Sequence, residues 1–147
     1  MAEILIVDDE RSMREIIRHC IGDLGHQIRE AENAQAALAR MAERPADVVF
    51  CDIQMPGEDG VWLTGQIRNT YHTTAVVLAT AVSTLAPNTT MRAGVMAYLV
   101  KPFSRIALVD ALNVALAWSD DARLRGTKPE DRGAQLDDWL DSIKDLD

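Results

Sequence analysis

The chain has 147 residues, of which 48% are hydrophobic and 26% charged, a balance that fits one ordinary globular domain and excludes a disordered or fibrous protein. Acidic residues outnumber basic ones by 23 to 15 and no run of lysine or arginine occurs, so no direct binding to nucleic acid is expected. The N-terminus lacks the basic and apolar regions of a signal peptide, and residues 69–91 carry too many polar side chains to span a membrane.

The two cysteines bear on the cellular compartment. Cys20 and Cys51 both lie in apolar stretches, and neither belongs to a CxxC or Cys/His metal-binding pattern. Buried free thiols are commoner in such surroundings than disulfide bonds. We therefore expect two free thiols and a reducing, cytoplasmic location.

Short apolar runs of strand length alternate along the chain with segments of helical periodicity. The first run, Ile4 to Val7, is rich in β-branched residues and ends at Asp8-Asp9. Strands that are apolar throughout are typical of parallel sheets covered by helices on both faces. The five expected strands are 4–7, 27–31, 48–51, 75–79 and 98–100.

Between these strands, apolar residues recur every three or four positions, which predicts helices with one buried face. Asn33 is placed to cap the second helix, and Pro87 falls in the first turn of the fourth, which is rich in serine and threonine. The pattern predicts an α/β fold with a doubly wound five-stranded parallel sheet. The five expected helices are 13–24, 34–41, 61–69, 83–91 and 108–116.

The composition becomes polar from about Ser119, which predicts a linker over 119–132. Over 133–147 an acidic amphipathic helix is expected. Its apolar face could fold back on its own domain, exchange between protomers, or belong to the first helix of an absent output domain; a loosely ordered acidic tail is the remaining alternative. The face consists of Leu136, Trp139, Leu140 and Ile143.

Polar and charged side chains follow the carboxyl ends of four expected strands. Asp8 and Asp9 follow the first strand, Asp52 the third, Thr80 the fourth and Lys101 the fifth. In parallel sheets these ends meet at one edge, where ligands bind. A group of carboxylate oxygens suits a hard cation such as Mg²⁺, and the lysine ammonium suits a phosphoryl oxygen.

Each of these residues alone has an ordinary structural explanation. Acidic residues often end strands, threonine is common within them, and a single lysine is usually a solvated charge. Three converging carboxylates, however, repel one another by several kcal/mol at an effective dielectric constant of about 20. Their combination therefore indicates a functional site.

Over about residues 3–118 these motifs resemble the receiver domain of two-component response regulators, the CheY-like family. The family combines an acidic pair, a phosphoacceptor aspartate with a following Met-Pro and Asp-Gly, a Thr-Ala pair and a Lys-Pro-Phe motif. We accordingly assign residues 1–118 to a receiver domain. The matching residues are Asp8-Asp9, Asp52, Met55-Pro56, Asp59-Gly60, Thr80-Ala81 and Lys101-Pro102-Phe103.

The resemblance implies a flavodoxin-like sheet with strand order 2-1-3-4-5 and five helices. It also implies that Asp52 accepts a phosphoryl group from a phosphohistidine of a sensor histidine kinase or phosphotransfer protein. Asp9, Asp52 and the main-chain carbonyl of Gln54 would hold Mg²⁺ or Mn²⁺, with Asp8 reaching the metal through water. The protein would then be a signalling domain that catalyses only its own phosphorylation and dephosphorylation.

Further roles carried over from the family concern the response to phosphorylation. Lys101 and Thr80 would contact the phosphoryl oxygens, and Thr80 with Tyr98 would form the switch, although simple packing is an alternative for Tyr98. The Lys101–Pro102 bond is expected to be cis. The signal would leave through the face made by the helix over 83–91, the strand over 98–100 and the helix over 108–116.

Two other functions share parts of this pattern. A pseudo-receiver would act as an interaction module without phosphorylation, but every site residue is present. A phosphatase of the haloacid-dehalogenase class also uses an aspartate nucleophile and Mg²⁺, but it needs a second aspartate where this chain has Gln54. The chain is expected to be either a stand-alone receiver or part of a longer regulator, with an output partner or domain and possible dimerisation through the face just described or the tail.

Overall fold

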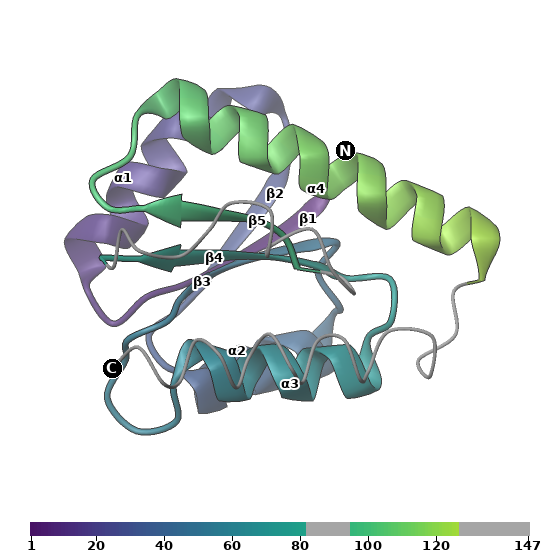
Figure 1. The fold of residues 1–147 in the computed structure, drawn as a ribbon, viewed down its shortest axis with the longest axis horizontal. Helices are drawn as coiled ribbons and strands as arrows, with labels where there is room; N and C mark the ends of the chain where they lie inside the picture. The colour runs from purple at the N-terminus through teal and green to yellow at the C-terminus, as the bar shows by residue number, and fades with distance from the viewer. Residues whose placement is uncertain (82–94, 127–147) are drawn as a thin grey trace.

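The computed structural model describes residues 1–81 and 95–126, and these form a parallel sheet of five strands in the order β2-β1-β3-β4-β5 (Figure 1). The fold class and the strand order are confirmed. β5 begins three residues earlier than expected, because Val95 already pairs with Val76 of the neighbouring strand. The strands are β1 (Glu3–Val7), β2 (Gln27–Ala31), β3 (Val48–Asp52), β4 (Ala75–Thr80) and β5 (Val95–Val100).

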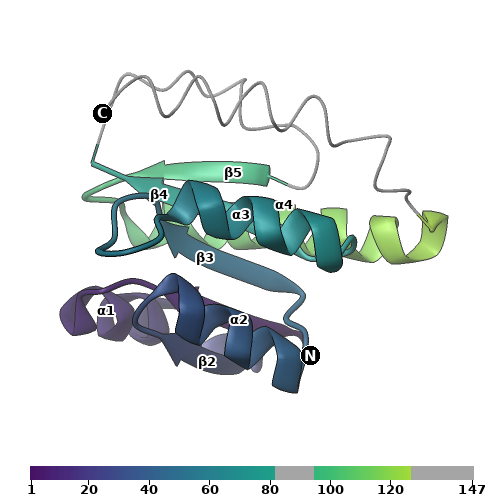
Figure 2. The ribbon, with the colours of Figure 1, turned by 90° about the horizontal axis from the view of Figure 1, so that it is seen from below.

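Helices cover both faces of the sheet. α1 and α4 lie on one face, and α2 and α3 lie on the other (Figures 1 and 2). The helices expected over 83–91 and 133–147 fall outside the described residues, so the label α4 belongs to the helix that follows β5. The helices are α1 (Arg11–Ile21) with the 3-10 turn η1 (Gly22–Leu24), α2 (Ala34–Glu43), α3 (Gly60–Thr70) and α4 (Arg105–Arg125).

The three central strands, β1, β3 and β4, are apolar because each contributes side chains to two cores. In β1, Leu5 and Val7 pack under α2 and α3, whereas Ile4 and Ile6 pack under α1 and α4. All residues of β3 and β4 are buried. None of the described helices is both long and apolar enough to cross a membrane.

Local signals in the sequence set several helix starts. The Asn33 side chain accepts a hydrogen bond from the Ala36 amide at 2.7 Å, which confirms the predicted cap of α2. Asp59 caps α3 in the same way, through the amide of Trp62 at 2.9 Å.

The cysteines are free thiols, as predicted.

The N-terminus of α3 lies directly against the end of β3. The Gly60 amide donates to the carbonyl of Ile53 at 2.9 Å, and a Cβ atom at this position would collide with the main-chain oxygen of Asp52. Gly60 is therefore required by a close backbone approach. This contact fixes the start of the loop that follows Asp52 at the end of β3.

α4 continues to Arg125, so the predicted polar linker is wrong for residues 119–125. The Ser119 hydroxyl is buried and donates to the Thr73 carbonyl at 2.6 Å. The Arg123 guanidinium donates to Ser119 at 3.1 Å and to Asp47 at 2.6 Å. The segment is polar in composition, but one side of it packs on the amino edge of the sheet, and the helix ends only at Gly126, whose φ of 61° is left-handed.

Replacing Ser119 with alanine should lower the free energy of unfolding by about 1–2 kcal/mol, because the half-buried Thr73 carbonyl loses its donor. Asp121→Ala is the matched control, since Asp121 pairs with Arg125 on the exposed side of the same helix. The control should change stability by less than about 0.5 kcal/mol. Urea unfolding of both variants checks this, and equal effects would show that residues 119–125 do not pack as described.

Replacing Gly60 with alanine should cost about 1–3 kcal/mol of unfolding free energy, because either α3 or the end of β3 must move. Gly65 provides the control within the same helix, since a Cβ atom there meets nothing within 4 Å. Gly65→Ala should therefore stabilise the protein by about 0.5–1 kcal/mol. Thermal or urea unfolding measures both; a stabilising Gly60→Ala would contradict the close approach.

Candidate functional site at the carboxyl edge of the sheet

The carboxyl ends of the strands bring the predicted charged side chains together. The Lys101 ammonium, which follows β5, lies 3.0 Å from Oδ2 of Asp8 and 3.3 Å from Oδ2 of Asp52. Asp8 follows β1 and Asp52 ends β3, two strands that pair directly. The Lys101 ammonium therefore bridges carboxylates from two strands, although Lys101 is 93 residues away from Asp8 in the sequence.

A third carboxylate completes an acidic cluster. One oxygen from each of Asp8, Asp9 and Asp52 lies within 4.8 Å of the others. Asp8 and Asp52 are buried, whereas Asp9 is exposed. The donors are all carboxylate oxygens, and one of them is open to solvent, which is the donor set that a hard divalent cation prefers.

Main-chain amides hold the two buried carboxylates in place. Oδ1 of Asp8 accepts from the amide of Glu10 at 2.9 Å, and Oδ1 of Asp52 accepts from the amide of Gln54 at 3.3 Å. In both residues the second oxygen faces Lys101. The orientation of each carboxylate is therefore set by one local amide and one distant cation.

Burial and neighbouring charges shift the proton affinities of this cluster. Burial raises the pKa of Asp52 above its usual 3.8, and the charge of Asp8 adds to the rise, while Lys101 opposes it. Burial alone would lower the pKa of Lys101, but its contacts with Asp8 and Asp52 outweigh burial and raise it above 10.5. Lys101 is therefore cationic at neutral pH.

The remaining predicted residues lie in β4 and β5 or directly after them. Thr80 is buried at the end of β4, and its carbonyl accepts from the amide of Lys101 at 2.7 Å. The Lys101–Pro102 peptide bond is cis, as expected. Tyr98 pairs with Leu78 in the sheet, but its side chain lies outside the described atoms, so its switching role stays a prediction.

Sequence analysis missed one residue that contacts this site. The Arg14 guanidinium of α1 donates from Nη1 to the main-chain carbonyl of Asp8 at 2.6 Å. A contact between a side chain and a main-chain oxygen leaves no complementary residue pair in the sequence. The one available signal was Arg14 and Arg18 one turn apart, which suggests a shared acidic partner.

The raised pKa of Asp52 has a consequence for stability. The folded chain binds this proton more tightly than the unfolded chain, so its stability falls as pH rises through the interval between the two pKa values. Asp52→Asn removes the buried charge and should therefore be more stable than the wild type near neutral pH, by about 0.5–2 kcal/mol. In acid, where the wild-type carboxyl is protonated, the gain should disappear.

Urea unfolding across this pH range, in the presence of a chelator, measures the difference. Asp121→Asn serves as the control, because Asp121 lies on the exposed side of α4. An increase in unfolding free energy that persists unchanged into acid, or a decrease at neutral pH, would contradict the conclusion that burial destabilises the charged form of Asp52.

Comparisons with known proteins agree with this geometry. A family model described as the response regulator receiver domain matches residues 4–113. The chain is 38% identical over 110 residues to the response regulator protein FleR of Pseudomonas aeruginosa, covering 74% of this chain and 23% of FleR. It is 35% identical over 102 residues to the transcriptional regulatory protein ResD of Bacillus subtilis, covering 69% of this chain and 42% of ResD.

The chain thus spans less than half the length of these two curated relatives. Among solved structures, the chemotaxis response regulator CheY4 of Vibrio cholerae superposes with a TM-score of 0.70 at 29% identity, covering 79% of this chain and 99% of CheY4. Since the family model covers most of the chain and the sheet order agrees, the chain belongs to the response regulator receiver domain family, whose members are CheY-like signalling domains.

Proposed function

We propose that this chain is a phosphoacceptor receiver, which takes a phosphoryl group on Asp52 from a phosphohistidine of a sensor histidine kinase or phosphotransfer protein. The observation that carries the proposal is the Lys101 ammonium, 3.0 Å from Asp8 and 3.3 Å from Asp52, beside the exposed carboxylate of Asp9. This arrangement supports the proposal because a buried carboxylate, a fixed cation and further carboxylate oxygens lie together at one edge of the sheet.

The chemistry asked of these residues is positioning and charge neutralisation. An oxygen of Asp52 would bond to phosphorus while the bond from phosphorus to the donor imidazole nitrogen breaks. The transition state of such a transfer is loose, with charge spread over the equatorial phosphoryl oxygens. Lys101 would stabilise that charge, and the buried Thr80 would donate its hydroxyl to the modified Asp52.

The acidic cluster supplies the metal ligands in this proposal. Asp9, Asp52 and the main-chain carbonyl of Gln54 would hold Mg²⁺ or Mn²⁺, and Asp8 would reach it through water. When bound, the cation neutralises the carboxylates and the phosphoryl oxygens and so lowers the repulsion between nucleophile and donor. Before the transfer, Asp8 would remain paired with Lys101.

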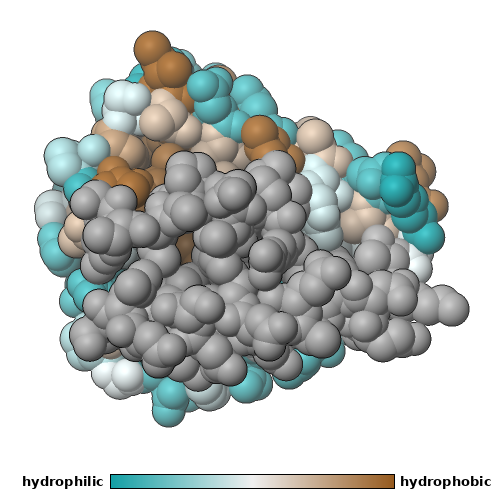
Figure 3. Space-filling model, in the orientation of Figure 1, coloured by the Kyte–Doolittle hydropathy of each residue, from teal (hydrophilic) through white to brown (hydrophobic). Residues whose placement is uncertain are grey.

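Output would pass through Thr80 and Tyr98 to the surface of β5 and α4; the third element expected at this surface, over residues 83–91, lies outside the described residues. Within the described residues, α4 exposes Ile106, Val114 and Leu124, and hydrophobic side chains are spaced along this helix among hydrophilic ones (Figure 3). These would meet the output partner, a second copy of the chain, or a domain joined to it. ResD is a transcriptional regulatory protein, so an output domain of that kind would act on transcription.

Incubation of the chain with acetyl phosphate and Mg²⁺ tests the proposal directly. We expect the intact mass to increase by one phosphoryl group, because Asp52 can attack a small donor as well as a phosphohistidine. Asp52→Asn should abolish the increase, a chelator should prevent it, and Asp121→Asn should leave it unchanged.

Two outcomes would replace this function with another. A wild-type chain that stays unmodified with Mg²⁺, acetyl phosphate or beryllofluoride would be a pseudo-receiver that acts by interaction alone. Continuous release of phosphate from common monoesters would instead indicate a phosphatase.

A further inference from the structure

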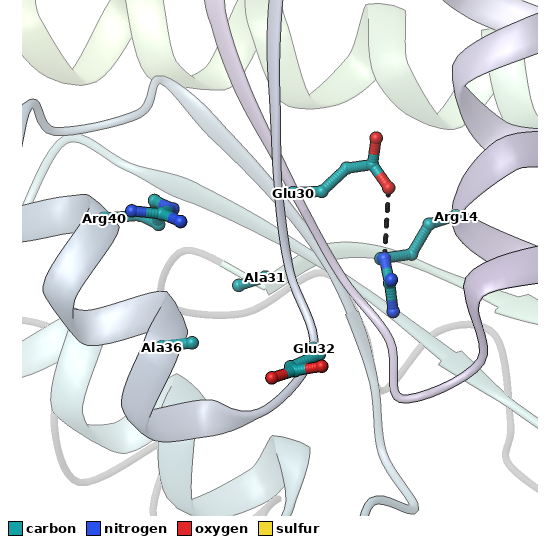
Figure 4. Close-up of a pocket in the computed structure, with 6 residues that line it drawn as sticks. All are labelled: Arg14, Glu30, Ala31, Glu32, Ala36 and Arg40. Atoms are coloured by element: carbon teal, nitrogen blue, oxygen red, sulfur yellow. Dashed lines mark hydrogen bonds and ion pairs between the residues drawn. The ribbon is translucent and has the colours of Figure 1, made fainter.

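Arg14 links the acidic pair to the neighbouring strand. Its Nε donates to Oε1 of Glu30 on β2 at 3.0 Å, and its Nη1 donates to the main-chain carbonyl of Asp8 at 2.6 Å. Figure 4 shows Arg14 and Glu30 pointing toward each other from α1 and β2, beside a pocket of about 200 Å³. Only 14% of the Arg14 side chain is exposed. The guanidinium is therefore held between two fixed acceptors.

The carbonyl that Arg14 contacts belongs to the peptide group joining Asp8 to Asp9. Asp8 is otherwise tied by its amide to the Ala31 carbonyl at 3.2 Å and by its carboxylate to Glu10 and Lys101. The contact with Glu10 closes a turn across the Asp8–Asp9 peptide, but of these contacts only the one from Arg14 is made to the carbonyl oxygen of that peptide. Arg14 therefore adds a restraint on the plane of the peptide, and the direction in which the exposed Asp9 side chain leaves the backbone depends on that plane.

Glu30 in turn holds Arg14. Its second oxygen, Oε2, accepts from Nε of Arg18 at 2.8 Å. Burial alone would raise the pKa of Glu30, but Arg18 and Arg14 outweigh burial and lower it below 4.5, so the carboxylate is charged at neutral pH. Arginines one turn apart repel each other on a bare helix, and the shared carboxylate removes that repulsion.

We propose that Arg14 is a positioning residue for the divalent cation: by orienting the Asp8–Asp9 peptide, it keeps the Asp9 carboxylate within reach of Asp52. The inference rests on the proposed function, since it concerns the same metal ligands. Arg14 acts only through the backbone and touches neither the cation nor the phosphoryl group. Loss of a residue that orients a metal ligand commonly weakens metal binding tenfold or more.

A purely structural ion pair between α1 and β2 is the competing explanation, and Arg18 separates the two. Arg18→Met breaks an ion pair to the same carboxylate but leaves the contact of Arg14 with Asp8 intact. Arg14→Met breaks both the ion pair and the contact. Both variants should lose stability, and only Arg14→Met should lose metal affinity.

The first measurement is calorimetric titration of the full chain with Mg²⁺ alone. Arg14→Met should weaken binding by about tenfold, whereas Arg18→Met should change it by less than about twofold. The second is amide hydrogen exchange of the metal-free protein, read at Asp9, whose amide belongs to the peptide that Arg14 orients. Exchange there should be faster in Arg14→Met than in Arg18→Met.

Chemical rescue provides a third measurement. Arg14→Ala extends the neighbouring pocket, so methylguanidinium can enter and occupy the position of the lost side chain. Added methylguanidinium should restore Mg²⁺ affinity in Arg14→Ala and have no effect on the wild type. If Arg14→Met does not fold, Glu30→Gln tests the same chain of contacts, with a smaller loss of affinity expected because Arg14 remains.

The inference is overturned if Arg14→Met binds Mg²⁺ as tightly as the wild type, if Arg18→Met loses as much, or if the wild type binds no Mg²⁺. Its failure is distinct from failure of the proposed function. A wild-type chain that binds Mg²⁺ but accepts no phosphoryl group would refute phosphoacceptor activity, while the affinity and exchange differences would still support the role of Arg14.

Discussion

The structure of the site depends on one cation placed between two buried carboxylates. Two carboxylate charges about 5 Å apart repel by about 3 kcal/mol at an effective dielectric constant near 20, so Asp8 and Asp52 need a permanent partner. Lys101 provides it from β5, two strands away from β3 in the sheet. A long, flexible side chain ending in a compact charge can reach past the end of β4, which a rigid, forked guanidinium does less readily. Neutralising the two carboxylates therefore depends both on the strand order and on a lysine at position 101.

The two edges of the sheet divide stability from function. At the amino edge, Asp47 pairs with Arg123, and Ser119 donates to the Thr73 carbonyl, so every group named there has its partner. At the carboxyl edge, burial raises the pKa of Asp52. The fold therefore holds this carboxylate in an environment that favours its protonated form. Proteins commonly carry such local destabilisation at functional sites and offset it elsewhere. The helical extension of α4 beyond residue 118 is part of that offset.

The sequence predicts the features that depend on periodicity or on strand ends. Four of the five strands follow from apolar runs, the cap of α2 from Asn33, and the meeting of Asp8, Asp52 and Lys101 from the parallel direction of their strands. It does not predict the helical path of residues 119–125, because a polar composition conceals which side of a helix is packed. Nor does it predict Arg14, because the acceptor is a main-chain oxygen that every residue type provides. Tertiary partners of polar side chains are the missing information in both cases.

Asp8 contacts both sides of the site, with three hydrogen bonds toward β2 and α1 and one toward Lys101. Its amide, its carbonyl and one carboxylate oxygen are tied to Ala31, Arg14 and Glu10, all on the side of β2 and α1. Only its second carboxylate oxygen faces Lys101 and β5. If modification of Asp52 draws Lys101 toward new phosphoryl oxygens, three contacts hold Asp8 in place and one contact gives way. The displacement would then pass to β5 and α4 and leave the metal ligands where they are, which is the direction that a signal toward an output partner requires.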